Sequence, residues 1–345
     1  IASCLVGSEM CIRDRSIIVA VAVGGEHTAF LDADGIIQEC GRAGGREGSK
    51  DAQGDRRPCR FRPERVLLKR RVLQVSAGDD FTIIITTKGE LWSWGRGDFG
   101  ELGADVRVRR DPGPCLTDER FAQVSAGSHH CLASTHDGML YAWGYGEDGA
   151  TGLDETAWRP RRVELVQGVV SDLSAGGAHS LLLVRGAVHS MGTTLNGRAG
   201  VPCGNPPVER AVFDCVRGLP NDIIRVAAGG EHSLCLTASG EVYAWGRGGR
   251  AGVNSLRDVW APTLVPLGAK AVAVAAHAAH SVVAMEDGTF RTFGNGDHGR
   301  LGCLDRFQRS DPRDKGLPVE MALPAEPKRR LKPHEYFGET ERRYA

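Results

Sequence analysis

The sequence contains no apolar run of the roughly 20 residues that a membrane-spanning helix requires, so no transmembrane segment is predicted. It also has no net charge, because 43 lysines and arginines balance 43 aspartates and glutamates. This balance removes any global electrostatic attraction to nucleic acid or to an anionic membrane, and we expect neither as a direct partner. No segment repeats its apolar residues with a helical period, so very little helix is expected.

The ten cysteines include no C-x-x-C pair, which is the usual signature of a zinc site or a redox centre. Several of them, such as Cys131 and Cys235, fall inside predicted buried strands. We interpret them as reduced core thiols of an intracellular protein, with a disulfide framework or a zinc site as the alternative.

Reactive constellations are missing as well. The sequence has no G-x-S-x-G nucleophile motif, and no cysteine has a catalytic signature around it. The adjacent carboxylates Asp79 and Asp80, and likewise Glu147 and Asp148, lie in predicted loops, where solvation explains them without acid–base chemistry. We therefore predict that the protein is not an enzyme and that it uses no cofactor and no metal.

What the chain does contain is a repeat in six copies, the clearest of which runs VAAGGEHSLCLTASGEVYAWGRGGRAG from Val226 to Gly252. The first fixed position of the copies is Gly24, Gly78, Gly127, Gly176, Gly229 and His277. A glycine follows 11 residues later in five copies and 10 residues later in the fourth, and another follows six residues further on in all six. The cores are constant in length while the spacers vary, as expected if the spacers are surface loops.

Each copy predicts short strands. In the second copy, the β-branched run 81–86 is followed by Lys88 and Gly89 and then by the apolar run 91–94. Asp-Gly or a similar pair between two apolar runs is a strong hairpin signal, because glycine supplies the positive φ of a tight turn. Four short strands in about 50 residues make one propeller blade. One position carries a large side chain in most copies, which predicts a packing wedge between blades: Trp94, Trp143, Trp245, Phe293, Met191 and Cys40.

The copies share the pattern A-G-x-x-H-[ST], then D-G, then [LV]-[WY]-x-[WF]-G-x-G-x-x-G-x-L-G. Over residues 21–302 this pattern resembles the regulator of chromosome condensation repeat family, and the resemblance implies a β-propeller, commonly of seven blades. We therefore expect an all-β fold, a β-propeller of four-stranded blades, with six recognisable repeats in this chain and seven blades in the complete protein.

The expected organisation has three parts. Residues 17–302 form the propeller. Residues 1–16 lie outside the repeat, do not fit a signal peptide and resemble translated sequencing-adaptor sequence. Residues 303–345 are a charged, proline-containing tail or a partial last blade. The basic cluster from Lys328 to Lys332 is read as a nuclear-import signal, an anion-binding patch or a solvated tail, so that both the cytoplasm and the nucleus remain open.

Two motifs that suggest ligands are explained by the repeat. The G-x-G-x-x-G fingerprint of dinucleotide-binding proteins begins at Gly95, Gly144 and Gly294, but no predicted helix follows it, so we interpret it as a turn between blades. Histidine recurs at one position in five copies, with Phe81 replacing it in the second. We expect these imidazoles to donate and accept hydrogen bonds within a tight turn, because residues about 50 positions apart do not predict one metal centre.

The positions at which the copies differ are the candidate site. They lie in the glycine-rich loop of each copy and would share one face of the propeller if the copies superpose. That face would be acidic in the second and third blades and basic in the fifth, which suits docking of a protein of complementary charge, while ordinary loop drift is the alternative. The candidate docking residues are Asp98, Phe99, Glu101, Glu147, Asp148, Arg247, Arg250, Asp297, His298 and Arg300.

We therefore expect a non-catalytic scaffold that mediates protein–protein interaction, with a protein as its partner. The family resemblance implies two alternatives. The first is a guanine-nucleotide exchange factor for a small Ran-like GTPase, and the second is the propeller fragment of a larger ubiquitin ligase. Neither of the longest spacers, residues 42–73 and 201–224, shows an obvious wedge of the kind that nucleotide exchange requires.

Overall fold

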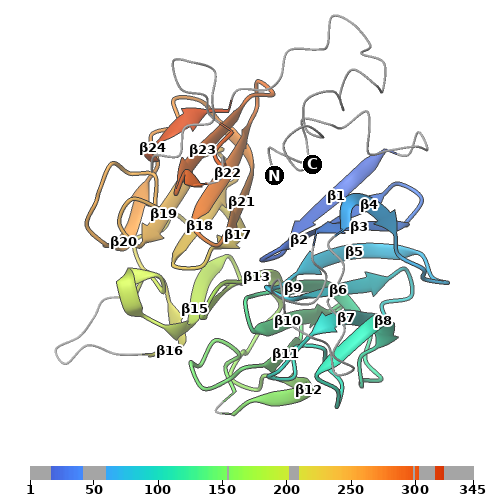
Figure 1. Cartoon of the computed structure of the whole chain (residues 1–345). Coiled ribbons are helices and arrows are strands. Elements are labelled where there is room, and N and C mark those ends of the chain that lie inside the picture. The colour runs from blue at the N-terminus through green and yellow to red at the C-terminus, as the bar shows by residue number, and fades with distance from the viewer. Residues whose placement is uncertain are drawn as a thin grey trace, which may run out of the picture.

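Six four-stranded antiparallel sheets surround a central axis in the computed structural model of the protein (Figure 1). The structure describes residues 17–41, 60–153, 155–201, 210–297, 300–302 and 315–321. The four strands of each sheet follow one another in the chain and pair in that order, which is the meander of a propeller blade. The predicted all-β propeller of four-stranded blades is confirmed, and we number the blades one to six in chain order.

The strands have the following bounds. Blades one and two contain β1 (Ile18–Val23), β2 (His27–Asp32), β3 (Ile37–Gly41), β4 (Arg60–Arg65), β5 (Val72–Ala77), β6 (Phe81–Thr86), β7 (Leu91–Arg96) and β8 (Val108–Pro114). Blades three and four contain β9 (Phe121–Ala126), β10 (His130–Thr135), β11 (Leu140–Gly144), β12 (Ala157–Arg162), β13 (Val170–Ala175), β14 (His179–Val184), β15 (Ala187–Thr193) and β16 (Arg210–Cys215). Blades five and six contain β17 (Ile223–Ala228), β18 (His232–Thr237), β19 (Val242–Gly246), β20 (Val259–Leu264), β21 (Ala271–His277), β22 (His280–Met285), β23 (Phe290–Gly294) and β24 (Lys315–Glu320).

The turn between the second and third strands of a blade is the predicted hairpin. In blade two, Gly89 has a φ of +76° and its N–H donates a hydrogen bond to the Thr86 carbonyl at 2.9 Å. The Thr86 hydroxyl oxygen accepts hydrogen bonds from the N–H groups of Lys88 and Glu90. Glycine adopts the positive φ of the turn without strain. The hydroxyl accepts hydrogen bonds from turn N–H groups that have no partner in the strand pairing.

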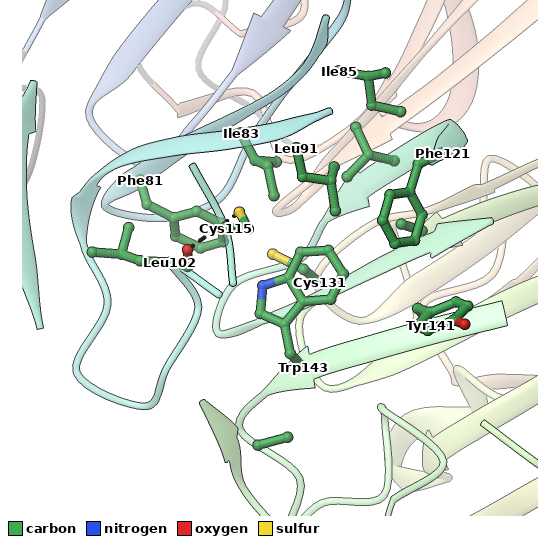
Figure 2. Close-up of a cluster of buried hydrophobic side chains, with 13 residues drawn as sticks. Phe81, Ile83, Ile85, Leu91, Leu102, Cys115, Phe121, Cys131, Tyr141 and Trp143 are labelled. Atoms are coloured by element: carbon green, nitrogen blue, oxygen red, sulfur yellow. Dashed lines mark hydrogen bonds between the residues drawn. The ribbon is translucent and has the colours of Figure 1, made fainter. Parts of the chain in front are cut away.

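The core lies between the blades, where the predicted wedge residues are buried. Trp143 of blade three is fully buried and belongs to one cluster with Phe81 and Ile83 of blade two (Figure 2). Its indole N–H donates a hydrogen bond to the Glu101 carbonyl at 2.8 Å, and Trp245 makes the equivalent bond to the Arg198 carbonyl at 2.9 Å. The wedge therefore buries apolar area, and in blades three and five it also ties the blade to a loop of the preceding one.

The last fixed glycine of the repeat is required by a close approach within the blade. Gly246 has a φ of +115°, and a Cβ atom there would lie 2.5 Å from the Cα atom of His232. A side chain at this position would meet backbone that cannot move away, and it would also strain its own φ. The third strand can therefore run close to the start of the second strand only if this residue is glycine.

Blades one and six differ from the blades between them. Every residue of β6, β10, β14 and β18 is buried, whereas alternate residues of β2 and β22 are only partly buried. These are Thr28 and Phe30 in blade one and Val282 and Ala284 in blade six. Among the described residues, blade six does not pack against blade one as consecutive blades do. The expected seventh blade stays a prediction.

A cavity of ≈ 540 Å³ follows the propeller axis. The first strands of the blades line it with small residues such as Ala77 and Ala126, and it extends to Phe30 of blade one and Val282 of blade six. The cavity thus opens between the two terminal blades.

Strand β24 pairs with β23 and completes sheet six, although it lies beyond residue 302 in the segment expected to be a tail or a partial last blade. Residues 1–16 and the basic cluster at 328–332 lie outside the described residues, and the predicted boundaries stay predictions. Within the ranges that are described, the helical structure is the short 3-10 helix η1 (Leu195–Gly197). No helix in those ranges is long and apolar enough to cross a membrane.

Candidate functional site: the loop face

One face of the propeller carries two sets of loops. In blades two to six, the turn between the first and second strands lies beside the start of the loop that leaves the third strand. Backbone hydrogen bonds hold them together, for example from Arg96 N–H to the Asp80 carbonyl at 2.9 Å and from Arg247 N–H to the Glu231 carbonyl at 2.8 Å. We call this surface the loop face, formed by the turns at 24–26, 78–80, 127–129, 176–178, 229–231 and 277–279 and the loops at 97–103, 145–153, 194–201 and 247–254 together with residues 295–297 and 300–302.

The glycine-rich loops are structural turns, as predicted. After Gly95 the chain leads to strand β8 and not to a helix. Gly100 has a φ of +90°, and a Cβ atom on it would lie 2.7 Å from the Cα atom of Trp158 in the outer strand of blade three. The loop of one blade therefore packs against the next blade, and the fingerprint here lacks the helix N-terminus that binds a pyrophosphate.

The recurring histidines have a structural role, but the hydrogen bonds predicted within the turn were wrong. In four of the five, the imidazole Nε2 reaches a hydroxyl of the next blade: His27 to Thr82 at 2.9 Å, His130 to Ser180 at 2.8 Å, His179 to Ser233 at 2.8 Å and His232 to Ser281 at 2.7 Å. The acceptor directly follows the equivalent histidine position in its own blade. The series is therefore a ladder that connects consecutive blades, which a single repeat read in isolation does not reveal.

The ladder changes composition between blades two and three. Phe81 takes the place of the histidine, and Cys131 takes the place of the hydroxyl that would receive it. Both residues belong to the same apolar cluster (Figure 2). A phenylalanine opposite a serine would leave the hydroxyl without its donor, whereas the Cys131 thiol packs with the ring in the same apolar cluster.

Surrounding groups fix the protonation of the ladder. The Ser180 hydroxyl donates to the Ala150 carbonyl and the Ser233 hydroxyl donates to the Arg198 carbonyl, both at 2.7 Å, so the imidazole Nε2–H is the donor to each hydroxyl. Burial lowers the pKa of His130 and of His232 to about 3. These imidazoles are therefore neutral at pH 7. No group of three potential metal ligands occurs among the described residues.

In blades two and three the candidate residues form an acidic region with an exposed aromatic ring. Phe99 is 40% exposed, and its ring contacts those of His129 and Tyr145, with centroids 5.6 and 5.1 Å away. Glu147 is exposed and accepts a hydrogen bond from the Tyr145 hydroxyl at 3.2 Å. Asp98 forms an ion pair with Arg96. The loops of the two blades thus meet around Phe99.

Three carboxylates of this region are at least partly withdrawn from solvent. Glu101 is buried, accepts the N–H of Phe99 at 2.8 Å and raises the pKa of His129 through a hydrogen bond. Glu101 is therefore a structural residue of its own loop, with little surface available to a partner. Burial raises the pKa of Asp148, and burial together with the neighbouring Asp79 raises that of Asp80.

In blade five the basic candidates share one carboxylate. Arg247 Nη1 lies 2.7 Å from Glu231 Oε2, and Arg250 forms an ion pair with the same oxygen. Arg198 from the loop of blade four lies 3.6 Å from the other oxygen of Glu231. The structure therefore brings Arg247 and Arg250 together, and it adds Glu231 and Arg198 to them.

The candidates in blade six form a third, separate group. Asp297 N–H donates to the Asn295 side-chain oxygen at 3.0 Å, and Arg300 approaches the same oxygen at 3.4 Å. His298 lies outside the described residues. The candidate residues thus form three local groups on the loop face and no single constellation.

Sequence reasoning missed His129, Tyr145, Arg198 and Glu231. A signal for two of them was present, because the residue directly before the repeat histidine varies between copies as the loop residues do. In blades three and five that residue is His129 and Glu231. Only the fold shows that this turn and the glycine-rich loop lie side by side.

Comparison with known proteins identifies the repeat. Two family models, both described as the regulator of chromosome condensation (RCC1) repeat, match residues 72–101, 121–150 and 223–250, and residues 88–134, 137–183 and 239–284. Together these matches span residues 72–183 and 223–284, about half of the chain.

Similar curated proteins belong to two functional groups. The mouse secretion-regulating guanine nucleotide exchange factor is 29% identical over 315 residues, which are 88% of this chain and 56% of that protein. The human E3 ubiquitin-protein ligase HERC2 is 36% identical over 137 residues, which are 36% of this chain and 3% of the ligase. This chain therefore spans about half of the exchange factor and a small part of the ligase.

Solved structures show the same fold. Yeast RCC1 (Prp20), determined in complex with Kap60, superposes with a TM-score of 0.74 at 23% identity over 89% of this chain and 75% of that one. Human WBSCR16 superposes with a TM-score of 0.76 at 22% identity over 91% of this chain and 85% of that one. At these identities the likeness extends to the fold and not to the function.

Proposed function

Because the chain belongs to the regulator of chromosome condensation (RCC1) repeat family, we propose that it is a non-catalytic β-propeller scaffold whose loop face docks a protein partner. One observation carries the proposal: the residues that differ between blades gather on the loop face, and their charge separates by blade. Asp98, Glu147 and Asp148 lie in blades two and three, and Arg247 and Arg250 lie in blade five. A rigid scaffold with variable charged loops is suited to selective docking.

The aromatic group around Phe99 supports the same proposal. Large aromatic side chains contribute much of the binding energy at protein interfaces, and Phe99 projects from loops held by strands on both sides. The acidic side chains beside it would direct a partner of opposite charge and would repel one of like charge. We place this docking inside the cell, where the free, buried thiols of Cys115 and Cys131 stay reduced.

Capture experiments with matched charge reversals test the docking proposal. One variant carries Asp98→Lys with Glu147→Lys, a second carries Arg247→Glu with Arg250→Glu, and a control carries Arg159→Glu with Arg161→Glu on the outer strand β12. A partner captured by the wild type should bind at least about tenfold more weakly to one of the loop-face variants, and within about twofold of wild type to the control.

Two outcomes contradict the proposal. If the β12 control weakens binding as much as the loop-face variants do, the partner does not recognise the loop face. If no partner is affected by either loop-face variant, docking through this face fails.

The alternative function is guanine-nucleotide exchange on a small Ran-like GTPase. It is supported by the similarity to the mouse exchange factor, which extends over 88% of this chain. The solved structure of Prp20p is described together with its binding to Gsp1p and histones, so a propeller of this fold can bind such proteins. The propeller portion of a larger ubiquitin ligase is the remaining alternative, supported by the match to HERC2.

Release of a fluorescent GDP analogue from a purified Ran-like GTPase tests the exchange alternative directly. An exchange factor should accelerate release at micromolar concentration, and the acceleration should disappear when the loop face is altered. Unchanged release with the wild-type chain at that concentration excludes exchange on that GTPase and leaves the docking proposal intact.

A further inference from the structure

The junction of blades four and five carries a group of basic side chains on the loop face. We call Arg198, Arg247 and Arg250, together with Glu231, the arginine cluster. Arg198 is only 7% exposed, and its Nη1 and Nε donate to the carbonyls of Gly230 and Leu195 at 3.1 and 3.0 Å. These bonds, to the turn of one blade and the loop of the other, hold its guanidinium in place.

The cluster contains more positive than negative charge. In the described part of the chain, Glu231 is the carboxylate in ion-pair contact with Arg198 and with Arg247, and it contacts Arg250 as well. Burial lowers the pKa of Arg198; Glu231 and Asp148 oppose this shift, while the neighbouring Arg250 and Arg247 add to it. Asp148 and Asp258 also act electrostatically on Arg198 and Arg247, but Glu231 is the carboxylate in ion-pair contact with the cluster among the described residues. Partly buried cations of like charge are unfavourable unless anions compensate them, so a further carboxylate in direct contact would be stabilised.

The cluster can be reached from solvent. The Arg247 side chain is 48% exposed, although one of its nitrogens contacts Glu231. The planar guanidinium presents five N–H donors, so Arg247 retains donors for a further carboxylate beyond the contact with Glu231. An incoming acidic side chain can therefore bind without displacing Glu231.

Two exposed apolar residues lie close to these cations through their backbone: the Leu195 carbonyl accepts the Arg198 Nε–H, and the Leu256 carbonyl packs against Gly248, the residue after Arg247. Leu195 is 63% exposed and Leu256 is 91% exposed. They belong to the loops of blades four and five, which the Asn196 side-chain N–H joins by donating to the Asp258 carboxylate at 3.1 Å. Exposed apolar groups beside arginines are typical of interface hot spots. The apolar side chains contribute buried contact area, and the arginine contributes directional hydrogen bonds.

The rest of the loop face decides between two kinds of anionic partner. A nucleic acid carries regularly spaced phosphates and would extend toward blades two and three, where Asp79, Asp80, Glu147 and Asp148 would repel it. A short acidic protein segment needs to contact only blades four and five. Its own apolar side chains would also cover Leu195 and Leu256, which a phosphate backbone would not do.

From this geometry we infer that the arginine cluster, with Leu195 and Leu256, binds an acidic protein segment that carries apolar residues, one carboxylate of which is bound by Arg247. The inference rests on the proposed docking function and specifies the partner chemistry of one part of the loop face. The acidic region around Phe99 is not part of this site.

The repeat offers a matched control for a direct binding test. Arg96 holds the same loop position in blade two, between Gly95 and Gly97, as Arg247 holds between Gly246 and Gly248, but it pairs with Asp98 in the acidic region. The probe is a fluorescent hexapeptide of four glutamates and two leucines, and its binding to the full chain is measured by anisotropy at low salt. We expect Arg247→Glu to weaken binding about tenfold, whereas Arg96→Glu should change it less than about twofold.

Leu256→Asn tests the apolar part of the site. Because this side chain is almost fully exposed, the substitution should leave the thermal midpoint unchanged and should weaken peptide binding about threefold. An unchanged affinity in a folded Leu256→Asn variant overturns the apolar part of the inference.

Three results overturn the inference as a whole: no binding of the hexapeptide at millimolar concentration, an equal loss from Arg96→Glu and Arg247→Glu, or tighter binding of a single-stranded DNA dodecamer that Arg247→Glu abolishes. The capture experiment separates this failure from failure of docking in general. Suppose that the double variant Asp98→Lys with Glu147→Lys no longer captures the partner, whereas Arg247→Glu still does. The acidic-segment inference is then wrong, but docking through the loop face is still supported.

Discussion

Blades two to five and the two terminal blades are built from the same repeat, yet they are packed differently. The second strand of each inner blade is buried at every position, while β2 and β22 leave alternate residues partly exposed. The partly exposed residues lie on the sides of blades one and six against which no neighbouring blade packs within the described ranges. It shows that the neighbour, and not the blade itself, completes the burial of a repeat, as expected for a repeat protein.

The terminal position also explains an exception in the repeat. A Cβ atom on Gly176 would lie 2.5 Å from the carbonyl oxygen of Gly229 in the following blade. His277 occupies the equivalent position in blade six, after which no described blade follows. At Gly176 a Cβ atom would also lie 2.7 Å from the imidazole Cε1 of His179 in the same blade. In blade six the carbonyl of a following blade is absent from the described residues, so one of these two obstacles is removed.

The largest expected difference concerns the wedge. Trp245→Ala, at an inner interface, should lower the free energy of unfolding by about 4 kcal/mol, because it leaves a cavity and removes the donor to the Arg198 carbonyl. Phe30→Ala, on the side of blade one against which no described blade packs, should cost about 1 kcal/mol or less. Urea unfolding followed by fluorescence and circular dichroism measures both losses of stability. Equal losses for the two variants would contradict the difference in packing between inner and terminal blades.

Exchanging the residues at the first fixed position should give the next largest effect. Gly176→His introduces at an inner interface the residue that blade six already has, and we expect a loss of about 3 kcal/mol from the collision with the Gly229 carbonyl. The converse change, His277→Gly, should alter stability by no more than about 0.5 kcal/mol. A tolerated Gly176→His would show that consecutive blades can separate at the axis.

Acid should destabilise the interfaces that contain a buried histidine. The folded-state pKa values of His130 and His232 are about 3, below the ordinary value of 6.5, so the unfolded chain binds protons that the folded chain does not. Stability is therefore fully present above pH 6.5 and is lost as the pH falls toward 3. Each such histidine should cost about 2 kcal/mol at pH 5, which unfolding curves at pH 7.5 and pH 5 would show. Equal stability at the two pH values would contradict the neutral, buried assignment.

The smallest expected effects concern single rungs of the ladder. His179→Phe should cost about 1.5 kcal/mol at pH 7.5, because Ser233 loses its donor. Adding Ser233→Cys copies the pair Phe81 and Cys131 and should recover about half of that loss. His280→Phe in blade six, where no hydroxyl of a following blade is in contact within the described residues, should change stability by less than about 0.5 kcal/mol. If the double variant His179→Phe with Ser233→Cys is no more stable than His179→Phe alone, a phenylalanine–cysteine pair cannot replace a histidine–serine pair at this junction.

Much of this fold could be predicted from the sequence because its signals are local. The hairpin at Gly89, the strands on either side of it and the wedge position of Trp143 each depend on residues close together in the chain. The interactions that join blades could not be predicted in the same way. The repeat gives the position of His130 within its blade, but its contact with Ser180 depends on how two blades are placed in space.

In the candidate site, too, local features could be predicted from the sequence and contacts between distant segments could not. The variable loop residues were recognisable, and the pairing of Arg247 with Arg250 follows from their closeness in the loop. The burial of Glu101 and the contact of Arg198 with Glu231 were not foreseen, because each depends on the packing of one loop against a turn or a neighbouring blade. Loop residues of like sequence thus differ in exposure according to what packs against them.

The pair formed by Phe81 and Cys131 gives the ring a preferred order of disassembly. At mild acid pH a proton can enter every blade junction that contains a buried ladder imidazole. The junction of blades two and three has none, and the imidazole that it does contain, His129, has its pKa raised by a hydrogen bond to Glu101. Those two blades should therefore separate last, as one cooperative unit that survives while the rest of the ring comes apart. The acidic region around Phe99 is built across that junction, so the part of the loop face that it forms would outlast the arginine cluster.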